Sequence, residues 1–190
     1  MTKGHSMQKS KMDKNKHYLT RAKYNTYLKE IEYMEGEGAK LLAKLLASSP
    51  GSGMGRPLDL PAHQIAREYQ GYLQEIRAIV KSAVIIDDLR DKVKDLEEVA
   101  IGCTVTIRYE DNGVEEYTIL GRHEVYIEQG RISFQSPVGS TLLGSHKGDT
   151  VLIRPTVRVI IEEVRRLSLD FYYPSTIWKK RLERALMIFS

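Results

Sequence analysis

The sequence has one cysteine and no long apolar run, and these scarcities exclude several kinds of protein. With Cys103 alone among its 190 residues, no internal disulfide and no cysteine-rich metal site can form. We expect Cys103 to be a reduced, buried, small apolar side chain. No apolar run approaches the roughly 20 residues of a membrane helix, and the N-terminus lacks the apolar segment of a secretory signal. The sequence therefore predicts a cytoplasmic protein without a membrane partner.

Positive charge is scarce in the middle of the chain and concentrated at its ends. Residues 1–23 have a net charge of +6 and residues 165–190 of +4, which leaves −6 for residues 24–164. A nucleic-acid-binding domain would carry basic charge on its folded body, so this distribution argues against one. A protein that binds nucleic acid through its basic ends stays an alternative, and it predicts steep salt dependence. We expect residues 1–18 to form a disordered basic tail.

Two long amphipathic helices are predicted in the N-terminal half. The first begins after Thr20, a suitable N-cap, and ends near Ala47, while Gly36 and Gly38 mark a kink or a close approach. A Gly-, Ser- and Pro-rich turn follows, and the second helix begins near Asp59 or Pro61. Its apolar residues recur at alternating steps of four and three, which indicates a coiled-coil partner. The predicted apolar positions are Tyr24, Leu28, Ile31, Leu41, Leu42, Leu45 and Leu46 in the first helix, and Leu58, Ala62, Ile65, Tyr69, Tyr72, Ile76, Ile79, Ala83 and Ile86 in the second.

Short β-strands separated by turn signals are predicted in the C-terminal half. The turn Glu110-Asp111-Asn112-Gly113 joins the first two, since Asn-Gly is a strong hairpin signal. Ser136-Pro137 begins a short helix that runs to Leu143 and is capped by Gly144. The strands are expected at 104–109, 115–120, 131–134, 151–153 and 158–164.

These patterns predict an α+β fold. An N-terminal antiparallel α-helical coiled-coil hairpin precedes a small, mostly antiparallel β-sheet domain with one helix. A C-terminal extension holds the only tryptophan, Trp178, and an apolar helical face of Leu182, Leu186 and Phe189. We expect this extension to pack on the sheet domain, and docking to a partner or to a second copy is the alternative. The expected boundaries are 1–18 (tail), 19–88 (hairpin), 89–98 (linker), 99–166 (sheet domain) and 167–190 (extension).

Several short segments between residues 19 and 165 match the sequence motifs of a known family, in the same order. The most specific runs from residue 132 to 149 and contains Ser136-Pro137 and Leu142-Leu143-Gly144. Further matches are Leu19-Thr20-Arg21, Tyr69-Gln70-Gly71-Tyr72, Ala83-Val84-Ile85-Ile86-Asp87, Gly102-Cys103-Thr104-Val105-Thr106, Gln129-Gly130-Arg131 and Gly148-Asp149-Thr150-Val151. On these residues the chain resembles the Gre family (GreA/GreB) of bacterial transcription elongation factors, which assist stalled RNA polymerase.

The resemblance implies a function and a partner. A sheet domain of FKBP-like fold would dock on RNA polymerase, and the hairpin would enter its secondary channel, in indirect contact with nascent RNA and DNA. The docking surface would include Ser136, Pro137, Ser140, Leu142 and Gly144. The chain would have no active site and no cofactor of its own, and Mg²⁺ would be shared with the polymerase.

The expected tip of the hairpin departs from the family pattern. Gre factors carry two acidic tip residues, which complete the coordination of a second metal ion during transcript cleavage. Here Asp59 matches the first acid, and Ala62 stands in place of the second. Asp59 is therefore the candidate catalytic, metal-assisting residue, although Asp also caps a helix well.

Three interpretations of the tip stay open. Asp59 alone supports weak cleavage, or the protein occupies the channel as an inhibitor without stimulating cleavage, or the tip has another role at the polymerase. A rival from the enzyme class is an FKBP-like prolyl isomerase or chaperone. Its pocket would use the aromatic residues Tyr109, Tyr117, Tyr126 and Phe134.

Overall fold

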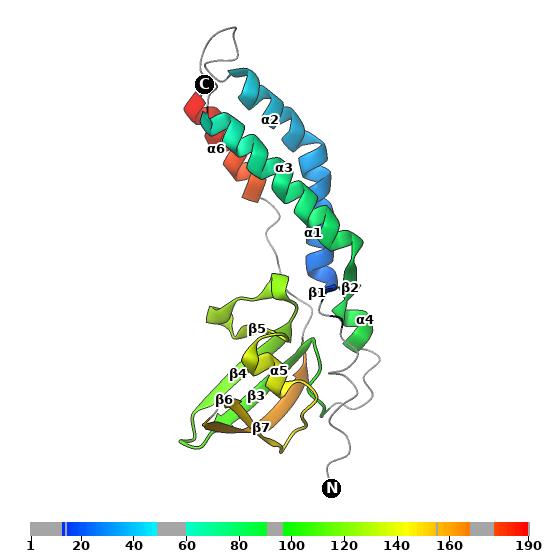
Figure 1. The fold of residues 1–190 in the computed structure, drawn as a ribbon, viewed down its shortest axis with the longest axis vertical. Coiled ribbons are helices and arrows are strands. Elements are labelled where there is room, and N and C mark those ends of the chain that lie inside the picture. Colours follow the sequence, from blue (N-terminus) through cyan, green and yellow to red (C-terminus); the bar gives the residue numbers. More distant parts are fainter. Residues whose placement is uncertain are drawn as a thin grey trace. The chain divides into compact units, whose positions relative to one another are not determined.

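The chain folds into two compact units. The sheet unit comprises residues 13–24 and 82–167, and the helical unit comprises residues 25–81 and 177–189, in each case as far as they are described. The computed structural model describes residues 13, 15–48, 60–90, 97–154, 156–167 and 177–189. Helices dominate one unit and strands the other, so the fold mixes α and β structure as predicted (Figure 1).

A five-stranded sheet forms the body of the sheet unit. Its strand order is β5-β4-β3-β7-β6, and neighbours are antiparallel except β4 and β5, which are parallel. The five strands lie within two residues of the positions predicted from the sequence. Their bounds are Cys103–Tyr109 (β3), Val114–Leu120 (β4), Arg131–Ser133 (β5), Thr150–Arg154 (β6) and Val157–Arg166 (β7).

One helix packs inside the curl of this sheet. Helix α5 (Pro137–Leu142) contacts β5 and β6, which are the two edge strands. Contact with both edges requires the sheet to bend around the helix, as Figure 1 shows. The fully buried side chains Val105, Ile107, Ile119, Leu142 and Ile161 form the centre of the core, and Cys103 is buried as predicted.

A small parallel strand pair lies outside the predictions. Strand β1 (His17–Leu19) pairs with β2 (Ala83–Ile85), and α4 (Ile86–Arg90) follows β2. The tail predicted for residues 1–18 therefore includes strand residues, while residues 1–12 and 14 lie outside the described part. The second helix was predicted to continue to Ile86, and this is wrong, because the backbone of Ala83–Ile85 pairs with β1 instead.

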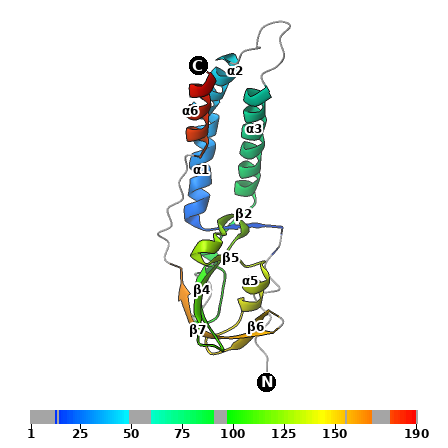
Figure 2. The same ribbon diagram turned by 90° about the vertical axis from the view of Figure 1, so that its left-hand side faces the viewer.

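The helical unit consists of two arms and a third helix. The first arm is α1 (Arg21–Glu35), whose first turn belongs to the sheet unit, followed by α2 (Glu37–Ser48). The second arm, α3 (Leu60–Lys81), runs back beside them, and α6 (Ile177–Phe189) lies along α2 (Figures 1 and 2). None of the helices among the described residues is both long and apolar enough to cross a membrane.

The contacts between the arms follow the predicted spacing on α3 but not on α1. Leu28, predicted to face α3, is 42% exposed, because the buried positions of α1 are offset from the predicted ones by about one residue. A tyrosine and a methionine, rather than aliphatic residues, define this face of α1. The buried apolar residues are Tyr27, Met34, Leu42 and Leu45 in the first arm, and Ala62, Tyr69, Leu73, Ile76 and Ile79 in α3.

The predicted break and close approach both occur in the first arm. Gly36 separates α1 from α2, and two residues later Gly38 is buried against Tyr69. The Tyr69 hydroxyl donates a 2.5 Å hydrogen bond to the carbonyl oxygen of Met34, and burial raises the pKa of Tyr69 to about 12. A Cβ atom at position 38 would lie 2.4 Å from the Tyr69 hydroxyl oxygen, so the absence of a side chain makes room for this bond.

The C-terminal extension packs on the helical unit, contrary to the prediction that it packs on the sheet domain. The Trp178 ring is 5% exposed and meets the Tyr69 ring edge-to-face, with 5.2 Å between the centroids. Leu182 is fully buried, Leu186 is half-buried, and the side chain of Phe189 lies outside the described part. The burial of Leu182 was predicted correctly, but α3 and α2 supply the partner surface of α6.

We expect Gly38→Ala to destabilise the protein. The added Cβ displaces the buried Tyr69 hydroxyl, and overpacking of this kind costs about 1–3 kcal/mol, which exceeds the gain in helix propensity. Chemical denaturation monitored by circular dichroism measures the change. The control is Gly71→Ala, because a Cβ at position 71 meets no atom within 4 Å and should stabilise α3 by about 1 kcal/mol. Equal effects of the two substitutions would contradict the close-approach explanation.

Candidate functional site

The short helix α5 is fixed at its start by a side-chain cap. The Ser136 hydroxyl accepts a 3.0 Å hydrogen bond from the Gly139 backbone N–H and donates one of 2.7 Å to the Ser133 carbonyl oxygen. Pro137 occupies the first helical position, where no N–H is needed. Gly144, just after the helix, has a φ of +79°. The Ser-Pro start and the Gly end therefore define both ends of α5, as the sequence predicted.

The predicted docking residues divide into a surface group and a core group. Pro137 and Ser140 are exposed and Ser136 is half-buried, so their side chains are accessible on one face of α5. Leu142 is fully buried and Gly144 is buried, so the prediction that they present a docking surface needs correction. Their packing under α5 holds the accessible residues in place.

Two buried carboxylates bind the start of α1. Glu124, only 3% exposed, accepts hydrogen bonds from the Thr20 backbone N–H (2.7 Å) and the Thr20 hydroxyl (2.6 Å). Asp87 accepts a 2.7 Å hydrogen bond from the Arg21 backbone N–H. The predicted cap is also present, because the Thr20 hydroxyl accepts a 3.2 Å bond from the Lys23 N–H. Negative charge at a helix N-terminus is favourable, so both carboxylates stabilise the first turn of α1.

Sequence reasoning did not identify the role of Glu124 or Asp87. Glu124 lies 104 residues from Thr20, and Asp87 lies 66 residues from Arg21. A local pattern carries no signal for contacts at that separation. Gly121, three residues before Glu124, lies so close to the Tyr18 carbonyl oxygen that a Cβ would be 1.8 Å from it. Glycine at position 121 therefore allows strand β1 to pass close by.

A histidine pair lies beside this anchor. The His17 Nδ1 and His123 Nε2 atoms are 2.8 Å apart, and the Arg122 guanidinium is 2.9 Å from His17 Nδ1. Burial lowers the pKa of His123 to about 4, with smaller contributions from His17, Arg122 and Lys23. His123 is therefore neutral near pH 7, and the described residues contain no group of three His, Cys, Asp or Glu that could hold a metal ion.

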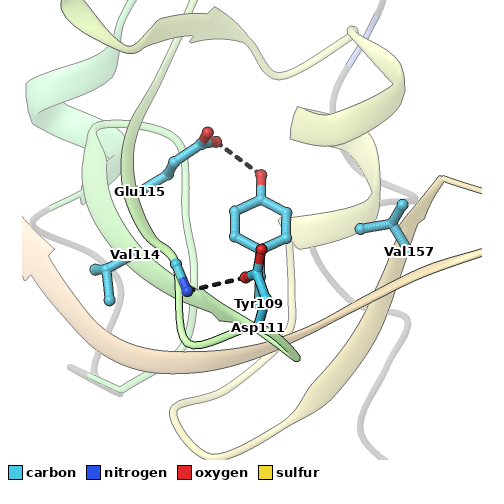
Figure 3. Close-up of a pocket in the computed structure, with 6 residues that line it drawn as sticks. Tyr109, Asp111, Val114, Glu115 and Val157 are labelled. Atoms are coloured by element: carbon cyan, nitrogen blue, oxygen red, sulfur yellow. Dashed lines mark hydrogen bonds between the residues drawn. The ribbon is translucent and has the colours of Figure 1, made fainter.

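One of the aromatic residues expected in a prolyl-isomerase pocket lines a hollow of the sheet unit. A hollow of about 440 Å³ lies at the β3–β4 turn, and of these four residues only Tyr109 lines it (Figure 3). The Tyr109 hydroxyl donates a 2.7 Å hydrogen bond to Glu115, and burial and this bond raise the pKa of Tyr109. Tyr117 also donates to Glu115, while Phe134 is buried in the core. This arrangement gives no support to the isomerase alternative.

The predicted tip residue Asp59 lies outside the described residues. The described part of α3 begins at Leu60, and Ala62 is fully buried. Ala62 was predicted to stand in place of a second acid, and its buried methyl group offers no metal ligand. Glu68, the first described carboxylate of α3, is engaged with Gln64 and Arg181.

Comparisons with known proteins find one family. A family model described as the C-terminal domain of the transcription elongation factors GreA and GreB matches residues 94–166. GreA of Chloroflexus aurantiacus is 34% identical over 141 residues, which cover 72% of this chain and 87% of the relative. GreA of a Roseiflexus species is 32% identical over 150 residues, covering 76% of this chain and 87% of the relative. The crystal structure of GreA factor homolog 1 (Gfh1) of Thermus thermophilus is 21% identical, with a TM-score of 0.34, covering 80% of this chain and 99% of that chain.

We expect Glu124→Gln to lower the free energy of unfolding by about 1–3 kcal/mol. The substitution removes a charge-assisted acceptor and places an amide N–H₂ opposite a donor of Thr20. Urea denaturation measures the loss, with Glu128→Gln, an exposed position nearby, as the control. If the two variants were equally stable, the buried anchor would not have the assigned role.

Proposed function

Because the chain belongs to the GreA/GreB family of transcription elongation factors, we propose that it binds RNA polymerase and modulates stalled or backtracked elongation complexes. The observation that carries the proposal is the match over residues 94–166, which includes the capped helix α5 and the strands around it. We propose a cytoplasmic location, where the polymerase acts.

In this proposal the two units have different tasks. The sheet unit corresponds to the FKBP-like domain and docks on the polymerase through the accessible face of α5, at Ser136, Pro137 and Ser140. The arms α1–α2 and α3 correspond to the coiled-coil hairpin, which enters the secondary channel. Their antiparallel packing through Tyr69, Ile76 and other buried residues gives the hairpin its rigidity. Contact with nascent RNA and DNA is indirect, within the elongation complex.

The chemistry of transcript cleavage would take place in the polymerase active site. Mg²⁺ bound there would polarise the attacking water, and Asp59 is the residue of this chain that would help to hold it. The family relationship supports the proposal that the chain acts on the active site of the polymerase.

A second candidate function follows from the alanine at position 62. With one tip carboxylate in place of two, the protein would occupy the channel without stimulating cleavage, and it would inhibit the polymerase. The alanine at position 62 favours this candidate, because its methyl group cannot bind a metal ion and so supplies no second ligand.

We expect Ser140→Arg to weaken binding to core RNA polymerase at least tenfold. A long charged side chain on the exposed face of α5 would obstruct close docking, as desolvated interface positions tolerate such changes poorly. Titration of labelled polymerase measures the dissociation constant, with Val114→Arg on the exposed start of β4 as the matched control. Equal affinity of the two variants would place the docking surface elsewhere.

The two candidate functions are separated by transcript cleavage in backtracked complexes. If Asp59 assists the metal, Asp59→Ala abolishes stimulation at saturating protein while polymerase binding is retained. If the protein is an inhibitor, the unaltered chain slows cleavage. Ala62→Glu is the companion variant, and we expect no gain in cleavage from it, since its carboxylate would replace a fully buried methyl group. Strong stimulation by Ala62→Glu would contradict the placement of this residue.

A further inference from the structure

Helix α6 packs against one side of the helical arms, near the end at which α2 stops and α3 begins. We call α2 and the first half of α3 (residues 37–48 and 60–72) the distal half. Trp178 packs on Tyr69 and Tyr72 of α3, with ring centroids 5.2 and 6.0 Å apart. Leu182 and Ala185, one and two turns further along, are buried as well. The distal half is therefore a bundle of three helices.

An ion pair joins α6 to α3 beside the apolar contacts. Arg181 pairs with Glu68, and its guanidinium also lies 4.7 Å from the centroid of the Trp178 ring. Gln64 donates a 3.0 Å hydrogen bond to the same carboxylate. Figures 1 and 2 both show α6 running beside α2 toward the end where α3 begins. The last turns of α6 therefore lie at the end of the arms that the proposed function places deepest in the polymerase.

We propose that α6 is an autoinhibitory helix, which must leave the distal half before the arms can enter the polymerase. The inference rests on the proposed function. A helix with its side chains is about 10 Å across, so α6 adds that thickness to the leading end of a two-helix arm. The matched family model ends at residue 166, so α6 lies beyond the matched domain.

The way α6 is held suits a reversible contact. Trp178, Leu182 and Ala185 are buried, but Ile177, Met187 and Ile188 are 65%, 79% and 69% exposed. Docking thus uses only part of the apolar surface of α6. The Arg181–Glu68 pair is itself partly exposed and adds little stability.

A reversible lock tests the proposal without removing α6. Glu68→Cys and Arg181→Cys are introduced with Cys103→Ala, and the two thiols are joined by a bismaleimide with a cleavable disulfide spacer. The side chains at positions 68 and 181 meet, so the spacer bridges them with α6 docked. Affinity for core RNA polymerase is measured on the locked protein and again after the spacer is cleaved.

We expect the locked protein to bind at least tenfold more weakly than the same protein after cleavage. The apparent affinity for polymerase is proportional to the fraction of molecules in which α6 has left the distal half. The cross-link keeps α6 docked and so lowers this fraction. The matched control joins Gln64→Cys and Glu68→Cys, neighbours on one face of α3, which ties no helix to another. Cleavage of the control spacer should leave the affinity unchanged.

Two results would overturn the inference. The first leaves the proposed function intact, and the second excludes it as well. If the locked and cleaved forms bind polymerase equally well, α6 is a permanent third helix and the proposed function stands. If the locked, cleaved and unaltered proteins all fail to bind polymerase, the proposed function fails and the inference fails with it.

Discussion

The carboxylates of Glu124 and Asp87 at the start of α1 are the constraint on which the rest of the structure depends. A helix N-terminus buried in a domain must satisfy its free N–H groups, and here Glu124 and Asp87 accept from Thr20 and Arg21. The parallel pair β1–β2 brings the entry to α1 and the exit from α3 together. Both ends of the long helical segment therefore belong to the sheet unit.

Local sequence signals predicted the sheet unit well. The Asn112-Gly113 turn, the Ser136 cap and Gly144 each act through contacts within a few residues, so their patterns are readable without coordinates. The tertiary contacts were not readable in this way. The polar anchor Glu124 joins residues more than 100 positions apart, and the strand β2 interrupts a helical periodicity that the sequence continues to Ile86.

In the helical unit, too, the sequence pattern did not determine which helix faces pack together. The spacing on α3 identified Tyr69 and Ile76 correctly, but on α1 the apolar and aromatic residues supplied two competing faces. Packing selected the face with Tyr27 and Met34 and left Leu28 exposed. The apolar face of α6 was equally clear, yet an amphipathic pattern names a buried face and not its partner, so only the structure places Trp178 on Tyr69. For the candidate site, the exposed part of α5 was predictable, and so was the burial of Ala62, which belongs to the predicted apolar face of α3, whereas the burial of Leu142 was not.

The central claim is that this chain uses the Gre-type binding mode on RNA polymerase. The most direct measurement is competition with a fluorescently labelled GreA for core polymerase, with increasing amounts of this protein. The account predicts displacement of the labelled GreA, complete at saturation, because both proteins need the same docking surface and the same channel. Stable binding of both proteins to one polymerase, or no displacement at any concentration, would contradict it.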